Sequence, residues 1–262
     1  MKHTPRKRFG QNFLVDRSII ARIVGAIDPQ PTDNLVEIGP GLGALTVPLL
    51  ERVPRLQVIE LDRDLAARLR ADYPPERVVV HEGDAARFDF STLAAPLRIV
   101  GNLPYNISTP LLFHLLSQRH VIHDMHFMLQ KEVVDRLGAE PGNKEYGRLS
   151  VMMQYLCEVQ PLFDVPAEAF DPAPKVTSAI VRLVPHHGQN PFGETTWAAM
   201  DTLLRCAFHA RRKTLRNNLK ALLTDAQMQN IDTNWSLRPE QLSVAEYVHL
   251  CQQLPADIQR QR

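Results

Sequence analysis

Cysteines are few in this sequence and lie far apart. Cys157, Cys206 and Cys251 are the complete set, and no two of them form a CxxC pair. Structural zinc sites and disulfide frameworks both need cysteines at close or regular spacing, so neither is expected. Such cysteine usage fits a reducing compartment, and we expect a cytoplasmic protein.

The sequence also lacks long apolar runs and a strong net charge. No uninterrupted apolar stretch approaches membrane-spanning length, and the basic segment 2–8 is not followed by an apolar signal core. Neither membrane insertion nor export is therefore expected. The formal net charge of +1 argues against a histone-like polycation but leaves room for local basic patches. With 262 residues and 44% hydrophobic content, the chain is long enough for one large domain and a small one.

The sequence also lacks a set of residues at the spacing typical of metal ligands. His120, His123 and His126 are closely spaced, but they straddle a predicted loop and strand. No carboxylate or cysteine with ligand spacing accompanies them, so no metal site is expected. Cys157 lies in an apolar stretch with Met152 and is interpreted as a core residue rather than a nucleophile.

The stretch that organises the chain is a glycine-rich turn at residues 37–43, Glu-Ile-Gly-Pro-Gly-Leu-Gly. It follows an apolar run, and it predicts a strand, a tight turn and the N-terminus of a helix. Glycine suits such a turn because it adopts backbone angles that side chains disfavour and lets a ligand approach the backbone. No Lys-Ser or Lys-Thr pair follows, so a P-loop is not indicated, although a dinucleotide pyrophosphate at the helix N-terminus stays open.

Two carboxylates lie at or just beyond the ends of the next two predicted strands. Glu60 lies in the strand 56–61, seventeen residues beyond Gly43, about where an acidic residue binds ribose hydroxyls in nucleotide-binding folds. Asp84 follows the strand 77–81, in a position to accept a hydrogen bond from an adenine amino group. Together with the glycine turn, these residues predict a site for a nucleoside-containing cofactor.

Strands and helices alternate over the first half of the chain, which predicts parallel βαβ units and an α/β, Rossmann-like fold. The expected strands are at 34–38, 56–61, 77–81, 97–101 and 124–130. The expected helices run from the N-cap Asp16 to Ile27 and over 44–53, 63–72 and 108–116. Strands at 162–165 and 178–184 bracket a proline-rich loop and predict a hairpin at the sheet edge.

The last third of the chain changes character. After a linker at 185–191, helical periodicity at 196–207, 211–223 and 239–253 predicts a small all-helical domain. We therefore expect two domains, residues 1–185 and residues 186–262. The second contains a run of basic side chains with no acidic one: Arg205, Arg211, Arg212, Lys213, Arg216 and Lys220. Such a run is either a solvated helix face or a surface that holds a nucleic acid backbone.

A short sequence, Asn102-Leu103-Pro104-Tyr105, ends the fourth predicted strand. An exocyclic aromatic amine is a poor nucleophile because its lone pair is delocalised into the ring. The Asn102 carbonyl and a backbone carbonyl at the proline turn could accept the two amine hydrogens and direct the lone pair at an activated methyl group, while Tyr105 stacks on the base. Such a reaction needs positioning rather than a metal. The alternative, a simple turn after a buried strand, is disfavoured by the glycine turn, Glu60 and Asp84 earlier in the chain.

The turn at 37–43 resembles motif I of S-adenosylmethionine-dependent methyltransferases. Nearly the whole chain resembles the bacterial small-subunit rRNA adenine N6,N6-dimethyltransferases of the KsgA/RsmA type. The matching stretches are 8–14, 37–43, 58–62, 82–85, 102–108, 147–151 and 170–178. The resemblance implies S-adenosyl-L-methionine as the cofactor and a methyltransferase sheet with a helical C-terminal domain. It also implies dimethylation of two adjacent adenines in the 3′-terminal stem-loop of 16S rRNA within the assembling 30S subunit.

By position, the resemblance assigns these cofactor-binding residues: Asn12, Leu14, Gly39, Gly41, Glu60, Asp84 and Asn102. The residues that would hold the target adenine are Asn102, Leu103, Pro104, Tyr105 and Phe170. A base enters such a pocket only by leaving its stack, at a cost of about a few kcal/mol, and aromatic faces offset part of that loss. The expected partner is 16S rRNA in the pre-30S or 30S subunit, and the expected oligomeric state is a monomer.

Three alternatives stay open at the level of sequence. The erythromycin-resistance type methylates an adenine of 23S rRNA with the same core, although segment 8–14 and Leu103 favour the small-subunit type. A methyltransferase-fold RNA-binding factor without catalysis is the second, and intact Glu60, Asn102 and Tyr105 argue against it. The third is a nicotinamide-dependent dehydrogenase, which a dinucleotide rather than S-adenosylmethionine would stabilise against melting.

Overall fold

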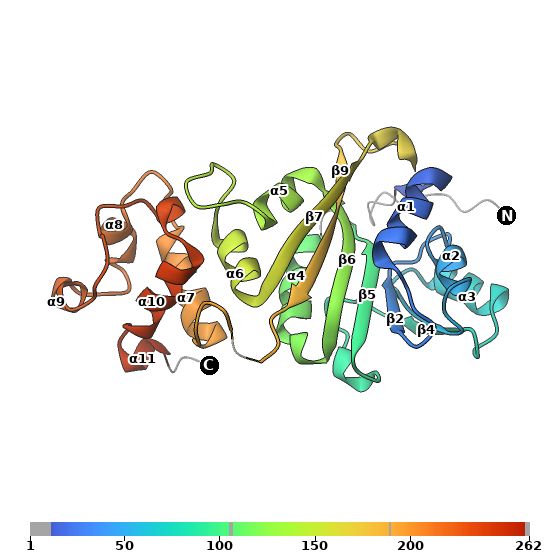
Figure 1. The fold of residues 1–262 in the computed structure, drawn as a ribbon, viewed down its shortest axis with the longest axis horizontal. Helices are drawn as coiled ribbons and strands as arrows, with labels where there is room; N and C mark the ends of the chain where they lie inside the picture. The colour runs from blue at the N-terminus through green and yellow to red at the C-terminus, as the bar shows by residue number, and fades with distance from the viewer. Residues whose placement is uncertain (1–11, 105–106, 189, 260–262) are drawn as a thin grey trace. The chain divides into compact units, whose positions relative to one another are not determined.

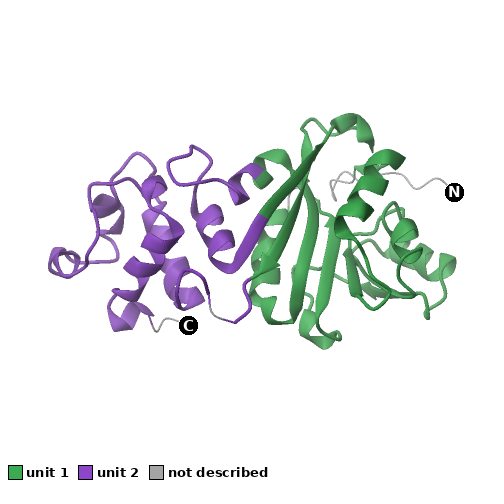
Figure 2. Cartoon of the chain, in the orientation of Figure 1, with its two compact units in different colours: residues 1–134, 160–185 green, residues 135–159, 186–262 purple. Residues whose placement is uncertain are grey.

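The computed structural model of the chain describes residues 12–104, 107–188 and 190–259. The chain forms two compact units: unit 1 is residues 1–134 and 160–185, and unit 2 is residues 135–159 and 186–262 (Figure 2). These units differ from the expected domains in one segment, 135–159, which groups with the C-terminal helices. The reason is that α6 (Arg148–Leu156) packs against α7 (Trp197–Ala207) and α10 (Val244–Gln252).

Unit 1 is built on a seven-stranded sheet with the strand order β4-β3-β2-β5-β6-β9-β7 (Figure 1). The strands are β2 (Asn34–Ile38), β3 (Leu56–Glu60), β4 (Val78–Glu82), β5 (Leu97–Asn102), β6 (Ile122–Gln130), β7 (Cys157–Val165) and β9 (Ser178–Pro185). The strands from β4 to β6 pair in parallel, and β9 joins β6 antiparallel. The predicted parallel α/β sheet is therefore confirmed, and the two late strands lie side by side at its edge.

Helix α1 (Arg17–Ile27) begins and ends where its sequence predicts. The Asp16 carboxylate accepts hydrogen bonds from the backbone N–H groups of Ser18, at 2.8 Å, and Ile19, at 3.2 Å, and so caps the helix. The helix stops at Asp28, which adopts a left-handed conformation with φ of 46°. Its buried face packs into the core through Ile23, Val24 and Ile27.

The helix after the glycine turn is shorter than expected, because α2 spans Thr46–Leu50 rather than 44–53. Pro48 occupies the third position of this helix, where a backbone N–H would have no acceptor within the helix, so the proline is tolerated there. The other helices that begin in unit 1 are α3 (Arg63–Asp72), α4 (Ser108–Ser117) and α5 (Lys131–Leu137). Helix α5 is not predicted from the sequence, because seven residues directly after a strand show little periodicity.

A two-stranded sheet attaches the N-terminal segment to the body of unit 1. β1 (Phe13–Leu14) pairs antiparallel with β8 (Phe170–Asp171), so that Leu14 lies opposite Phe170. The backbone N–H of Val15 adds a hydrogen bond to the carbonyl of Ala169 at 2.8 Å. Pairing between such short segments leaves no periodic pattern, and sequence analysis does not predict it.

Unit 2 is helical, as expected, and its further helices are α8 (Leu215–Leu219), α9 (Asp225–Gln229) and α11 (Ala256–Gln259). The expected helix 211–223 is wrong in extent, because Thr214 caps α8 by accepting a hydrogen bond from the N–H of Asn217. Likewise, Ser243 and Glu246 form a capping box that starts α10 at residue 244 rather than 239. Among the residues that the structure describes, no helix combines the length and hydropathy needed to cross a membrane.

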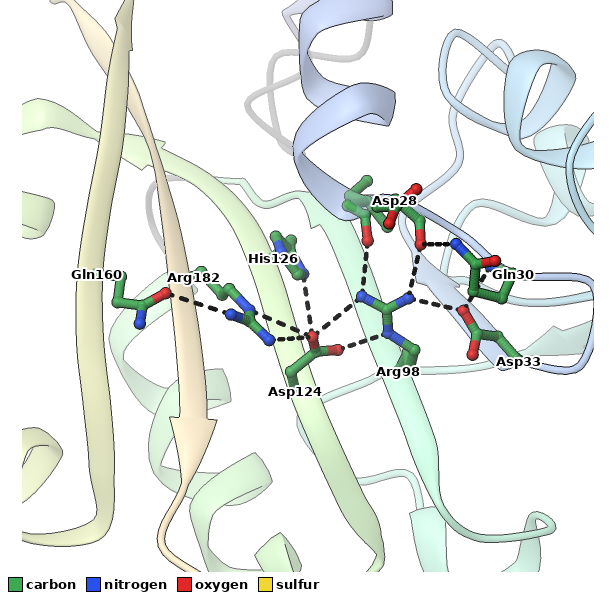
Figure 3. A network of polar contacts seen from close by, with 9 residues as sticks. Asp28, Gln30, Asp33, Arg98, Asp124, His126, Gln160 and Arg182 are labelled. Carbon is green, nitrogen blue, oxygen red and sulfur yellow. Dashed lines mark hydrogen bonds and ion pairs between the residues drawn. The ribbon is translucent and has the colours of Figure 1, made fainter.

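A charged network fixes α1 to the sheet at the amino-terminal ends of the parallel strands (Figure 3). The guanidinium of Arg98, on β5, uses all five of its N–H groups. It donates two hydrogen bonds to Asp124 on β6, at 2.9 and 3.1 Å, and one to Asp33, at 2.6 Å. The remaining two go to the carbonyls of Ile27 and Asp28, where α1 ends. The helix is thus held at its C-terminus by Arg98, while its N-terminus follows directly on β1.

Candidate active site

A pocket of about 630 Å³ opens at the carboxyl ends of the parallel strands in unit 1, a size typical of cofactor sites. Its walls come from the N-terminal segment 12–15, the glycine turn 39–43, the end of β3, residues 83–85 after β4 and residues 102–104 at the end of β5. Open α/β sheets bind ligands at this edge. The fold therefore gathers the segments that sequence analysis selected into one cavity.

The three glycines of the turn adopt conformations that other residues rarely take. Their φ angles are 65° at Gly39, 58° at Gly41 and 87° at Gly43. A Cβ atom at Gly41 would lie 3.3 Å from the ring of Phe13, a closer approach than side chains normally tolerate. The turn therefore requires glycine for its backbone conformation and, at Gly41, for space next to Phe13.

Glu60 is held rigidly in the pocket wall by backbone donors. Its Oε1 accepts a hydrogen bond from the N–H of Asp62, at 2.9 Å, and its Oε2 accepts one from the N–H of Gly41, at 3.2 Å. Burial raises the pKa of Glu60, and these two hydrogen bonds oppose that rise. Because a carboxylate offers about four acceptor positions, Glu60 retains acceptor capacity for a ligand hydroxyl.

Glu37, to which sequence analysis assigned no role of its own, also lines this pocket. The residue is 2% exposed, and the hydroxyl of Thr46 donates a hydrogen bond of 2.6 Å to its Oε2 atom. Burial raises the pKa of Glu37 to about 7, against the hydrogen bond from Thr46 and with a contribution from the negative charge of Glu60. In the sequence, the feature that could have drawn attention to Glu37 is its position as the first residue of the glycine motif. Its burial is evident only from the fold.

Asn102 and Asp84 lie on opposite sides of the glycine turn in the sheet order and both line the pocket. The side-chain amide nitrogen of Asn102 donates a hydrogen bond to the backbone carbonyl of Asn12 at 3.2 Å. This leaves the side-chain oxygen of Asn102 as its acceptor end. Asp84 accepts from the N–H of Ala86 at 2.9 Å through Oδ1 and remains partly exposed. Both side chains therefore have oxygen atoms with acceptor capacity for a ligand.

The remaining predicted residues divide into three cases. Leu14, Leu103 and Pro104 line the pocket. Tyr105 lies outside the described residues, and its stacking role stays a prediction. Phe170 is 4% exposed, packs in the core cluster and is absent from the described pocket lining. Its contact with a base also stays a prediction.

The six basic residues of unit 2 fall into two groups. Arg205 pairs with Asp201, Arg216 pairs with Asp225, each at 2.8 Å, and Arg211 donates to the backbone carbonyl of Lys144. The side chains of the other three are exposed and make no hydrogen bond or ion pair within the described part of the chain: Arg212, Lys213 and Lys220. A phosphate backbone would meet the second group without competition from an internal partner.

No group of three His, Cys, Asp or Glu side chains gathers as a metal site within residues 12–104, 107–188 and 190–259. Of the three closely spaced histidines, His126 is buried on β6 beside Asp124 in the Arg98 network. Burial lowers the pKa of His126 to about 4, so the ring is neutral at physiological pH.

The composition of the pocket fits S-adenosylmethionine better than a dinucleotide. Among the described residues, four carboxylates line it, at Glu37, Glu60, Asp62 and Asp84, against one guanidinium, at Arg17. S-adenosylmethionine carries a net positive charge and no phosphate, whereas the pyrophosphate of a dinucleotide would bring negative charge to this acidic cavity. The glycine turn and the carboxylate of Glu60 both line this cavity. The dehydrogenase alternative is therefore disfavoured.

Comparison with known sequences also points to a methyltransferase, and the match extends over nearly the whole chain. The family model described as Ribosomal RNA adenine dimethylase matches residues 2–254. The Ribosomal RNA small subunit methyltransferase A of Marinobacter nauticus is 59% identical over 253 residues, which cover 95% of this chain and 91% of that protein. The protein of the same name from Dechloromonas aromatica is 55% identical over 255 residues, with 96% and 98% covered.

Solved structures with a similar fold include two that cover more than nine-tenths of this chain. The dimethyladenosine transferase from Plasmodium falciparum superposes with a TM-score of 0.75 at 26% identity, covering 91% of this chain and 95% of that one. The 23S rRNA methyltransferase ErmE superposes with a TM-score of 0.70 at 24% identity, covering 93% and 99%. The second likeness shows the fold alone.

Proposed function

Because the chain belongs to the ribosomal RNA adenine dimethylase family, we propose that it dimethylates the N6 amines of two adjacent adenines in the 3′-terminal stem-loop of 16S rRNA. S-adenosyl-L-methionine is the methyl donor of the family. The observation that carries the proposal is a single pocket that joins the glycine turn, Glu60 and Asn102. We place the reaction in the cytoplasm, on the assembling small subunit, with a monomeric enzyme.

The chain's own residues would act by binding and orientation. Glu60 would accept hydrogen bonds from the ribose hydroxyls of the cofactor, and Asp84 would accept one from its adenine amine. Segment 12–14 lines the same pocket. The sulfonium of S-adenosylmethionine supplies a methyl group that is already activated, so no side chain has to act as a nucleophile or metal ligand. This division of labour leaves positioning of the target amine as the main catalytic task of the protein.

The target amine would be oriented by two acceptors at the end of β5. The carbonyl of Pro104 accepts the N–H of Ile107 within the turn, at 3.2 Å. The backbone carbonyl of Leu103 and the side-chain oxygen of Asn102 are then the candidates for the two amine hydrogens. Acceptance of both hydrogens favours a tetrahedral nitrogen whose lone pair points along the line of methyl transfer. Tyr105 and Phe170 would contact the faces of the flipped base.

The decisive experiment is transfer of labelled methyl groups to undermodified small and large ribosomal subunits in parallel. We expect up to four methyl groups per small subunit, all recovered as N6,N6-dimethyladenine at two adjacent positions. Label in the large subunit would instead assign the chain to the erythromycin-resistance type. Binding of the small subunit with no methyl transfer would assign it to a non-catalytic factor.

A further inference from the structure

Glu37 is a buried acid in the wall of the cofactor pocket. It is the penultimate residue of β2 and lies two residues before Gly39, the first glycine of the turn. Within the described residues its carboxylate has one hydrogen-bond donor, the hydroxyl of Thr46, which contacts Oε2 at 2.6 Å. A carboxylate this deeply buried normally has a cationic partner or several donors, because burial penalises the charged form.

The charged and titratable groups around Glu37 come from several elements. The negative charge of Glu60, on β3, contributes to the raised pKa of Glu37. The negative charge of Glu37 in turn contributes to the raised pKa of Tyr73, at the end of α3. Asp62 and Asp84 bring further negative charge to the same pocket, and Arg17 at the start of α1 is the cation among its described lining residues. Burial raises the pKa of Glu37 to about 7, so the protonated and ionised forms coexist near neutral pH.

The two ligands that would alternate in this pocket differ by one charge. The methyl donor has a sulfonium, an ammonium and a carboxylate, and its net charge is positive. The product, S-adenosylhomocysteine, has a thioether in place of the sulfonium and is neutral overall. A positive charge in a cavity of low polarity favours ionisation of a nearby carboxyl group, whereas a neutral ligand that displaces water does not.

We propose that Glu37 is a proton-linked specificity residue of the pocket, which loses its proton when the sulfonium donor binds and retains it when the thioether product is bound. The inference rests on the proposed function, because it takes S-adenosylmethionine as the ligand. The O–H bond of Glu37 breaks, the proton passes to the solvent buffer, and the carboxylate then balances the charge of the donor. The pocket thereby favours the donor over the product, which assists product release.

The sign of the pH dependence follows from linkage. A ligand that selects the ionised form of Glu37 binds more tightly as pH rises through the pKa of the free pocket, and the gain ends once Glu37 is already ionised. Donor affinity should therefore rise by up to about tenfold between pH 6 and pH 8, with most of the change below pH 7.5. Product affinity should stay constant within about twofold over the same range.

The test is isothermal titration calorimetry of the full-length protein with each ligand, at pH 6, 7 and 8, in buffers of different ionisation enthalpy. This readout counts protons and does not depend on methyl transfer. For the donor we expect release of about half a proton at pH 7 and more at pH 6. For the product we expect almost none. Glu37→Gln should abolish the difference between the two ligands, because the amide keeps the shape of the side chain but does not titrate.

Thr46→Val provides a second variant. The hydrogen bond from the Thr46 hydroxyl lowers the pKa of Glu37. Its loss should therefore move the rise in donor affinity to higher pH, while proton release on donor binding persists. A purely structural role for Glu37 would not move that profile. Equal proton release with both ligands, or unchanged release in Glu37→Gln, would overturn the inference and leave the proposed function intact. Failure of the unaltered protein to bind either ligand would refute the proposed function together with the inference.

Discussion

The side chain of Asn102 is hydrogen-bonded to the backbone carbonyl of Asn12, with 3.2 Å between the amide nitrogen and the oxygen. This contact joins the end of β5 to the segment that leads into β1. It also fixes the orientation of the Asn102 amide, whose nitrogen is occupied and whose oxygen is the acceptor end. A residue proposed to accept a hydrogen from the target amine is thus oriented before the substrate arrives.

Replacement of Asn102 tests that role. Asn102→Ala should lower the single-turnover rate of methyl transfer at saturating subunit and cofactor far more than it lowers RNA affinity. An interaction that improves mainly in the transition state appears in the rate, with about 1.4 kcal/mol for each tenfold loss. Tyr105→Phe is the matched control in the same motif and should be mild, since stacking needs the ring rather than the hydroxyl. A near-normal rate for Asn102→Ala would make the motif a scaffold.

The parts of the fold that sequence predicted are those with local physical causes. Asp16 predicted the start of α1 because an N-cap acts on the next three residues. Short apolar runs that alternate with helical segments predicted the strands from β2 to β6, because strands of a parallel sheet are buried on both faces. The glycine turn was predicted because positive φ angles select glycine.

The remaining features depend on partners that are distant in the chain. Leu14 pairs with Phe170 through two-residue strands, and Arg98 reaches both Asp33 and Asp124. No local sequence pattern indicates which distant residues will pair in these contacts. Of the candidate site, the residues on strand ends could be predicted because parallel strands end at one edge of the sheet, whereas the burial of Glu37 depends on how the neighbouring elements pack.

Glu60 should be essential for cofactor binding but not for folding. Glu60→Gln keeps the shape of the side chain, yet one of its terminal atoms becomes a donor and faces a backbone N–H group. Hydrogen bonds to charged groups are worth about 1.5–3 kcal/mol, so we expect affinity for S-adenosylmethionine to fall by about ten- to a hundredfold. Calorimetry measures this directly, with the melting temperature as a control for folding. Unchanged affinity would remove Glu60 from the ribose site.

The exposed cations Arg212 and Lys213 should contact the RNA backbone. A double replacement by glutamine should raise the apparent KM for small subunits and flatten its salt dependence, by roughly 0.7–0.9 in log–log slope per lost phosphate contact. The matched control is the double replacement of Arg205 and Arg216, which removes the same charge from residues already paired with Asp201 and Asp225. If both double variants change the slope equally, net charge rather than a specific contact is responsible.

Arg98 should be a major contributor to stability. The Asp124 side chain is fully buried, and replacement of Arg98 by methionine would leave that carboxylate with Arg182 as its remaining guanidinium partner. Removal of one member of a buried ion pair costs about 3–5 kcal/mol, and the contact of Arg182 should reduce this toward the lower limit. The stability of Arg98→Lys should lie between those of the unaltered protein and Arg98→Met, because lysine keeps the charge but offers three donors instead of five. Denaturant unfolding measures both, and a lysine variant as stable as the unaltered protein would show that charge alone suffices.

His126 should make the protein sensitive to mild acid. Burial lowers its pKa to about 4 in the folded chain, whereas an unfolded histidine titrates near about 6.5. The unfolded chain therefore takes up a proton first as pH falls. The resulting loss of stability begins below about pH 6.5 and is complete near pH 4, where it amounts to about 3 kcal/mol. Asp124 titrates in a separate pH range. Burial raises its pKa, but the hydrogen bonds from Arg98 and Arg182 and the nearby positive charges together outweigh this and leave the pKa below its usual value. The stability that this provides is lost only as pH falls below about 4.

The two windows allow a clean test of His126. The free energy of unfolding, measured in urea from pH 7.5 to pH 4.5, should fall less steeply for His126→Gln than for the unaltered protein, because glutamine does not titrate. His187→Gln removes an exposed histidine and should follow the unaltered protein throughout. Curves of equal slope for the unaltered protein and His126→Gln would mean that the folded protein accommodates the protonated ring. The carboxylate of Asp124, whose Oδ2 atom lies 4.0 Å from Nδ1 of His126, would then be the candidate partner of that ring.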